Sequence, residues 1–210
     1  VLFRSRLIQL IQRLHKKNFF ERYNEEIGKM IENGYAEKTT KRYSERTYVM
    51  PHREVIREDK DTTKIRIVHD ASASGKDGKS LNENIYKGTT PKWNSFSVLL
   101  NFRKGEIAAA ADVEKAFMQI EIEKKDRDAT CFLWVDEKNQ EIWLRMTRVP
   151  FGTTASPYLL YIVLDKHFDN YEEEFTEIVP QLRKCMYVDD ALPSLDSATA
   201  MVPNSSNNNQ

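Results

Sequence analysis

Two adjacent aspartates, Asp189 and Asp190, interrupt the last apolar run of the chain, which extends from Cys185 to Leu192. Two like charges at the turn of a buried hairpin repel each other unless something neutralises them. Because two acids interrupt an otherwise apolar run, we predict a β-hairpin over these residues with both acids at its turn. Taken alone, the pair is explained best as an exposed turn that faces water, because aspartate favours turns. The alternative is a bound divalent cation, and hard carboxylate oxygens favour Mg²⁺.

The first half of the chain combines helical spacing with short strand-like runs. Apolar residues fall at helical spacing over 7–14 and 23–31, before Asn33-Gly34, so we expect a helical lead-in over residues 1–46. Strands are predicted over Thr47–Pro51 and Lys64–Val68, with Arg53–Asp61 as a loop or hairpin tip and Ala71–Lys79 as a loop.

The second half shows the same mixture. Ser95 is predicted to cap a helix through Phe102 that ends by Gly105, whereas Ile107–Ala111 fits a helix or a buried strand. Further predictions are a hairpin of Thr130–Val135 with Glu141–Arg148, a helix from Ser156 to about Phe168, and a helix over Tyr171–Ile178 that ends before Pro180. This order predicts an α+β fold with antiparallel strands and no doubly wound parallel sheet.

Charge and composition set wide limits. Lys plus Arg and Asp plus Glu both number 32, so net charge neither supports nor excludes a nucleic-acid partner. Cys131 and Cys185 form no ligand motif and are expected to be small buried residues in a reducing compartment. Because there is no apolar run of about 20 residues and no signal peptide, we expect a soluble, intracellular protein without a membrane partner.

Both ends of the sequence suggest a piece of a longer protein. The chain starts at Val1, and the polar tract from Pro203 to Gln210 cannot bury surface. We therefore expect an incomplete chain with a disordered tail over residues 196–210.

Four ordered blocks carry a family resemblance. They are Lys64-Ile-Arg-Ile-Val-His-Asp70, continuing to Ser80-Leu-Asn82; Ala109-Ala-Ala-Asp-Val-Glu-Lys-Ala-Phe117; Arg148-Val-Pro-Phe-Gly-Thr-Thr-Ala-Ser-Pro157; and Tyr187-Val-Asp-Asp190. Together they resemble the reverse transcriptases, most closely those of BEL/Pao-type LTR retrotransposons. The combination is far more specific than any single block.

The resemblance implies a metal-dependent catalytic centre. Asp112, Asp189 and Asp190 would be the catalytic acids, and Asp112, Asp189 and the carbonyl of Val113 would bind Mg²⁺, with Mn²⁺ as an alternative. Two such ions would activate a primer 3′-hydroxyl and stabilise the leaving pyrophosphate. Tyr187 would lie against primer or template. The alternative for Asp112, considered without its partners, is a helix cap.

The resemblance also implies a nucleotide site. Lys64 and Arg66 would bind the triphosphate, Phe117 would exclude a 2′-hydroxyl, and Phe151 with Gly152 would shape the pocket. The alternatives are an ordinary solvated strand face for Lys64 and Arg66, a core position for Phe117, and a strand-to-helix turn at Phe151 and Gly152.

The implied architecture is a right-hand polymerase with fingers over about 47–105 and 118–149, a palm with an antiparallel sheet backed by helices over about 106–117 and 150–195, and no thumb. The implied activity is RNA-directed DNA polymerisation from dNTPs on a primed RNA or DNA template, in a cytoplasmic retrotransposon particle. The thumb, RNase H, integrase and protease segments are expected as partners encoded elsewhere. A polymerase that copies only DNA is one alternative. An inactive truncated remnant that binds nucleic acid or another protein is the second, although a degenerating copy should have lost some of its three acids.

Overall fold

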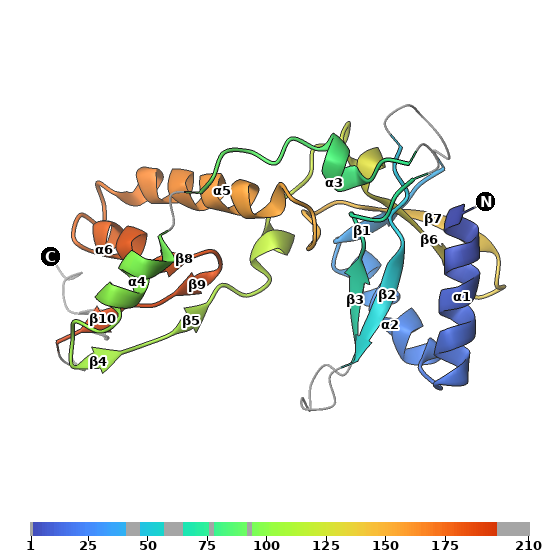
Figure 1. The fold of residues 1–210 in the computed structure, drawn as a ribbon, viewed down its shortest axis with the longest axis horizontal. Coiled ribbons are helices and arrows are strands. Elements are labelled where there is room, and N and C mark those ends of the chain that lie inside the picture. Colours follow the sequence, from blue (N-terminus) through green and yellow to red (C-terminus); the bar gives the residue numbers. More distant parts are fainter. Residues whose placement is uncertain (1, 41–46, 57–64, 76–77, 92–93, 197–210) are drawn as a thin grey trace, which may run out of the picture. The chain divides into compact units, whose positions relative to one another are not determined.

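The computed structural model describes residues 2–40, 47–56, 65–75, 78–91 and 94–196. The chain forms two compact units. Unit 1 contains Val1–Gly88 and Phe117–Ser156, and unit 2 contains Thr89–Ala116 and Pro157–Gln210. Helices and antiparallel strand pairs are mixed in both, as expected for an α+β fold (Figure 1).

Unit 1 packs two amphipathic helices against two small sheets. Its elements are α1 (Leu2–Lys16), α2 (Phe20–Glu32), β1 (Ala36–Lys38), β2 (His52–Ile56), β3 (Ile65–His69), α3 (Leu81–Asn84), the 3₁₀ helix η2 (Arg127–Thr130), β6 (Cys131–Val135) and β7 (Glu141–Met146). One sheet has the order β1-β7-β6 and the other is the β2–β3 hairpin. The apolar faces of α1 and α2 bury Leu10, Leu14 and Tyr23 against Phe132 and Trp134 of β6. The described part of the expected lead-in, residues 2–40, therefore contributes to the core of unit 1, and residues 1 and 41–46 lie outside the described residues.

The segment around β2 corrects two predictions. Residues 53–56 of the expected loop or hairpin tip 53–61 belong to β2, and residues 57–61 lie outside the described residues. Val49, in the expected strand 47–51, makes an isolated bridge to Cys131. The charged stretch can form a strand because Glu54, which is buried, accepts hydrogen bonds from Arg13 of α1 and from Lys17, which directly follows that helix. Those partners are distant in sequence, so local polarity indicated a loop. The predicted 130–148 hairpin is confirmed as β6–β7.

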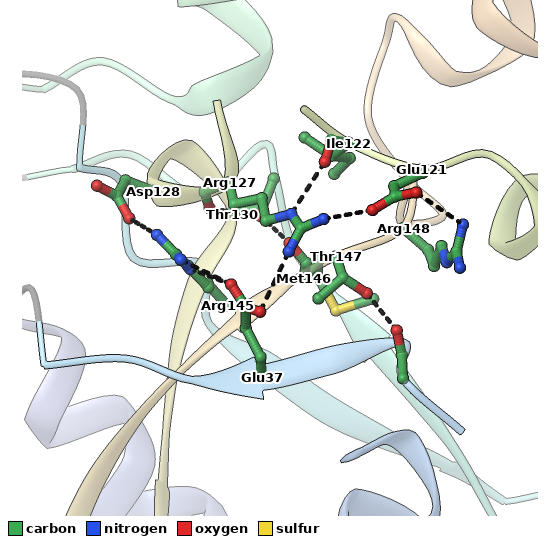
Figure 2. A network of polar contacts seen from close by, with 11 residues as sticks. Glu37, Glu121, Ile122, Arg127, Asp128, Thr130, Arg145, Met146, Thr147 and Arg148 are labelled. Atoms are coloured by element: carbon green, nitrogen blue, oxygen red, sulfur yellow. Dashed lines mark hydrogen bonds and ion pairs between the residues drawn. The ribbon is translucent and has the colours of Figure 1, made fainter. Parts of the chain in front are cut away.

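A network of ion pairs ties the 3₁₀ helix η2 to the β1-β7-β6 sheet of unit 1 (Figure 2). The buried guanidinium of Arg127 donates to Glu37 at 3.1 Å, to Glu121 at 2.6 Å and to the carbonyl of Ile122 at 2.9 Å. Arg145 donates to Glu37 at 2.7 Å and to Asp128 at 2.5 Å. A buried charge is tolerated only when it is paired, and here each arginine meets two acids. The network holds residues 121–122 on this sheet.

The described residues of unit 2 form three short strand pairings and three α-helices. Its elements are α4 (Ser95–Asn101), β4 (Ile107–Ala108), β5 (Ala111–Asp112), α5 (Ser156–Tyr171, whose first residue belongs to unit 1), α6 (Ile178–Cys185), β8 (Met186–Tyr187), β9 (Asp190–Ala191) and β10 (Ser194–Leu195). The 3₁₀ helix η1 (Ala116–Gln119) lies at the boundary of the two units. The sheets have the orders β5-β9-β8 and β10-β4, and α4 contacts both α6 and β8 (Figure 1).

Helix ends in unit 2 differ from the predictions. The side chain of Asn94, and not that of Ser95, caps α4 by accepting from Ser97. The expected helix 171–178 is wrong, because α6 begins at Ile178 and carries Pro180 in its first turn. Proline costs no hydrogen bond there, since the first amides of a helix lack intrahelical partners.

Glycine at position 105 serves strand pairing and does not end α4, which stops at Asn101. A Cβ atom at position 105 would lie 2.5 Å from the carbonyl oxygen of Leu195. The amide of Gly105 instead donates to Ser194 Oγ at 2.7 Å, so that β10 can pair with β4. The ambiguous run 107–111 is thereby resolved as strands.

Three further expectations can be compared with the structure. Cys131 and Cys185 are buried free thiols. No helix among the described residues has the length and apolar character needed to cross a bilayer. The expected disordered tail lies outside the described residues except for Asp196.

Candidate functional site

The two aspartates of the Tyr-Val-Asp-Asp block lie on the predicted hairpin, formed by β8 and β9. Met186 pairs with Ala191 and Tyr187 with Asp190, so Val188 and Asp189 form the turn. The expectation that both acids lie at the turn is therefore wrong for Asp190, which is the first residue of β9. Asp190 is part of a strand because β9 pairs with β8 on one side and with a third strand, β5, on the other.

That third strand carries Asp112. In β5, Asp112 pairs directly with Asp190, and the amide of Val113 donates to the carbonyl of Asp189 at 2.8 Å. Two acids that are 78 residues apart in sequence (190 − 112) thus become cross-strand neighbours. Directly paired residues of an antiparallel ladder lie on the same face. Asp112 is a strand residue and not a helix cap, and Val113 follows it immediately.

The turn of this hairpin is strained. Val188 has a φ of +59°, a left-handed conformation that a β-branched residue rarely adopts. Such strain persists only where surrounding contacts hold the backbone, and here β5 and β8 both pair with β9. The strained residue directly precedes Asp189, so the backbone direction at that carboxylate is fixed by the sheet.

The acids are accessible to a ligand. Asp112 and Asp190 are exposed and Asp189 is half-buried. The carbonyl of Val113 accepts from the amide of Ala116 at 3.2 Å and retains a second lone pair. Tyr187 at the edge of the hairpin is 41% exposed.

The donor set suits Mg²⁺, although it does not form a complete cage. Within the described part of the chain, no group of three or more His, Cys, Asp or Glu side chains is arranged to hold a metal ion. Mg²⁺ is usually held by one or two carboxylates, with substrate phosphates and water as its other ligands. Asp112 and Asp189 with the Val113 carbonyl fit that pattern.

Unit 1 brings together the expected aromatic residues. Phe117 and Phe151 meet edge to face, with ring centroids 4.8 Å apart and an interplanar angle of 78°. Phe117 is only 7% exposed and Phe151 is 49% exposed. The core alternative therefore describes Phe117 in part, because Phe151 presents the accessible ring of the pair.

Backbone geometry explains the glycine at position 152. Gly152 has a φ of +89°, and an added Cβ would lie 3.2 Å from the carbonyl oxygen of His69. A left-handed conformation and a close backbone neighbour both favour glycine. The turn alternative for this block is therefore correct at the level of local structure.

Of the two residues expected to bind phosphate, the structure describes Arg66 and does not describe Lys64. Arg66 is an exposed residue of β3, and its guanidinium makes no ion pair with the described residues. Lys64 lies outside the described residues. Of the two, Arg66 is therefore the side chain that the structure describes, and it is open to an anionic ligand.

Sequence reasoning assigned no role to Asn82, yet this residue organises the Pro-Phe-Gly block. Its amide nitrogen donates to the carbonyl of Gly152 at 3.0 Å and to Ser72 Oγ at 2.8 Å. Its oxygen accepts from the amide of Thr154 at 2.9 Å. The available signal was its place in a capping box, where Ser80 and Glu83 begin the short helix α3.

Comparison with solved structures identifies the type of fold. The chain is similar to the foamy viral protease-reverse transcriptase dRH determined in complex with double-stranded DNA, with a TM-score of 0.57 and 19% sequence identity. The match covers 81% of this chain and 25% of the viral chain. The fold is thus reverse transcriptase-like, and the chain spans a quarter of the length of the viral protein that it matches.

The family follows from the sequence match. Residues 58–203 match the family model described as reverse transcriptase (RNA-dependent DNA polymerase). This match covers more than half of the chain, which therefore belongs to the reverse transcriptase family. A search of curated proteins found no match.

Proposed function

We propose that the chain carries the catalytic acids of an RNA-directed DNA polymerase that adds deoxynucleotides to a primer 3′-hydroxyl. The observation that carries the proposal is the β5-β9-β8 sheet, which pairs Asp112 with Asp190 and bonds Val113 to Asp189. Membership of the reverse transcriptase family supports the same reaction. The fingers are proposed over about residues 47–105 and 118–149, and the palm over about residues 106–117 and 150–195.

Asp112, Asp189 and the Val113 carbonyl are the residues that would hold Mg²⁺, with Asp190 as a less direct partner. The ion, when bound, would lower the pKa of the attacking 3′-hydroxyl and neutralise charge on the leaving pyrophosphate. The chain's own contribution is orientation. The Val113–Asp189 hydrogen bond and the strained Val188 turn hold the backbone that carries the carboxylates before substrate arrives, which lowers the reorganisation needed during the reaction.

The nucleotide roles concern residues of unit 1. Arg66, with Lys64, is proposed to donate charge-assisted hydrogen bonds to the triphosphate. Phe117 is proposed to exclude the ribose 2′-hydroxyl, and Phe151 with Gly152 is proposed to shape the nucleotide pocket. The edge-to-face contact with Phe151 would limit rotation of the Phe117 ring. Tyr187 is proposed to contact primer or template.

Primer extension on poly(rA)/oligo(dT) with Mg²⁺ tests the proposal. We expect Asp189→Asn to reduce incorporation of dTMP by more than about 100-fold, because second-shell changes at metal sites already cost about 10–100-fold. Asp126→Asn is the matched control, since this aspartate is exposed in unit 1 and makes no side-chain cap hydrogen bond. Equal incorporation above background by wild type and Asp189→Asn would exclude the proposed site.

The same assay separates the alternatives. A polymerase that copies only DNA would extend poly(dA)/oligo(dT) and not poly(rA)/oligo(dT). An inactive remnant would extend neither while still binding the primed template in a mobility-shift assay. The BEL/Pao affiliation, the cytoplasmic particle and the thumb, RNase H, integrase and protease partners remain proposals that rest on the sequence blocks.

A further inference from the structure

The sheet that carries the catalytic acids is small. The β8–β9 and β5–β9 ladders each contain two residue pairs. Hairpins of this size are marginal in isolation, and they depend on neighbouring elements for their stability. The position of Asp189 therefore depends on what holds the ends of the hairpin.

One end of the hairpin is the end of a helix. Cys185 is the last residue of α6 and Met186 is the first residue of β8, so no linker separates them. The amide of Leu192 donates to the carbonyl of Cys185 at 2.9 Å and closes the base of the hairpin. A shift of α6 would therefore displace β8 and the turn that carries Asp189.

Arg183 joins α6 to α5 two residues before that junction. Its guanidinium pairs with Asp165, with Asp169 at 2.6 Å and with Glu172 at 3.8 Å. It also lies over the ring of Phe168, 5.4 Å from the centroid. Asp165, Phe168 and Asp169 are spaced at i, i+3 and i+4, so they lie on one face of α5, and Glu172 directly follows the last residue of that helix.

We infer that Arg183 is a positioning residue for the metal-binding hairpin, acting through α6 on Asp189. This inference rests on the proposed function of that hairpin. The planar guanidinium can bridge two acids while it stacks on an aromatic ring, and a lysine ammonium cannot do all three. Arg183 thereby fixes α6 along its axis and in rotation, which a single ion pair would not do.

Binding of Mn²⁺ to the full chain, followed by electron paramagnetic resonance of the free ion, tests the inference without relying on catalysis. Arg183→Met keeps an apolar side chain over Phe168 but removes the charge. Arg183→Lys keeps the charge but removes the planar guanidinium that bridges two acids. Lys184→Met is the matched control, because Lys184 is an exposed neighbour on α6 with no ion pair among the described residues. The apparent Mg²⁺ requirement in primer extension is measured on the same proteins.

We expect Arg183→Met to weaken Mn²⁺ binding about 10-fold, at the low end of second-shell effects, with a parallel rise in the Mg²⁺ requirement. Arg183→Lys should fall between Arg183→Met and wild type, and Lys184→Met should match wild type. If Arg183→Met does not fold, the Mn²⁺ affinity of Arg183→Lys relative to wild type decides whether the inference holds.

Asp189→Asn separates the two claims. If Asp189→Asn loses Mn²⁺ binding while both Arg183 variants bind within twofold of wild type, the inference is wrong and the proposed site stands. If Asp189→Asn binds Mn²⁺ as wild type does, the proposed site fails and the inference fails with it.

Discussion

Two buried histidines make the stability of unit 1 sensitive to pH. His52 accepts a hydrogen bond from the hydroxyl of Tyr23 at Nδ1 (2.5 Å) and donates from Nε2 to the carbonyl of Leu133 (2.8 Å). His69 packs against the ring of Phe132, and its buried Nε2 has no partner in the structure as described. Burial lowers the pKa of His52 to about 4, and burial together with the neighbouring His52 lowers the pKa of His69 to about 3.

The sign and size of the effect follow from these values. A depressed native pKa stabilises the fold above the unfolded-state pKa of about 6.5, and this contribution is lost as the pH falls toward the native pKa. Between pH 7 and pH 5 the unfolded chain protonates both rings while the native state keeps them neutral. Each histidine then costs about 2 kcal/mol, so the pair should lower the free energy of unfolding by about 4 kcal/mol.

Two carboxyl groups with lowered pKa values stay ionised between pH 7 and pH 5, so they do not contribute to the change in stability over this range. Burial raises the pKa of Glu54, but hydrogen bonds from Arg13 and Lys17 outweigh it and lower the value to about 2. Glu37 also has a lowered pKa, because hydrogen bonds from Arg145 and Arg127 outweigh its burial. Both carboxylates lose their stabilising contribution below about pH 4.5, outside the window.

Urea unfolding at pH 7 and pH 5, followed by tryptophan fluorescence, measures the change, since Trp134 and Trp143 are both buried in this core. His69→Phe should halve the pH-dependent loss to about 2 kcal/mol, whereas the exposed His15→Gln should leave it at about 4 kcal/mol. A wild-type change below about 1 kcal/mol, or a His69→Phe variant with the full loss, would refute the reasoning.

Three further predictions concern backbone and loop geometry. Gly105→Ala should lower the free energy of unfolding in urea by about 1–3 kcal/mol, because the added Cβ meets the backbone of Leu195. Gly28→Ala in α2 is the control, because its added Cβ meets nothing within 4 Å, and it should raise the free energy of unfolding by about 0.5–1 kcal/mol. Val188→Pro should abolish Mn²⁺ binding because proline cannot adopt φ +59°, and Val188→Gly should retain binding. Asn82→Ala should cost about 1–3 kcal/mol by leaving the partner backbone groups of the Pro-Phe-Gly block unpaired, measured by urea unfolding; a loss below about 0.5 kcal/mol would contradict this.

The sequence predicted elements where the local pattern and the tertiary environment agree. The first two helices and the 130–148 hairpin are confirmed because apolar periodicity and a polar turn coincide there. At the hairpin turn, Asp136 Oδ1 accepts from the amides of Lys138 and Gln140, so the turn sequence specifies its own structure. Local chemistry was sufficient in these segments.

Predictions failed where a distant residue decides the structure. Glu54 lies in a strand because Arg13 of α1 neutralises it, and Asp190 lies in a strand because Asp112 pairs with it. The acids of the candidate site could be named from the four sequence blocks, since residue types and order carry that signal. The contacts of Asn82 and Arg183 could not be predicted, because each joins segments that are remote in sequence. The capping box around Asn82 indicates the start of a helix but not the residues that Asn82 contacts.

Fe²⁺ in place of Mg²⁺, with hydroxyl-radical cleavage of the chain mapped by mass spectrometry, tests most directly whether Asp112 and Asp189 bind one metal centre. The β5-β9-β8 sheet predicts two cleavage clusters, around residues 110–114 and 187–191, and both should disappear together in Asp189→Asn. Cleavage at one of these segments alone, or two clusters that persist in Asp189→Asn, would contradict the account.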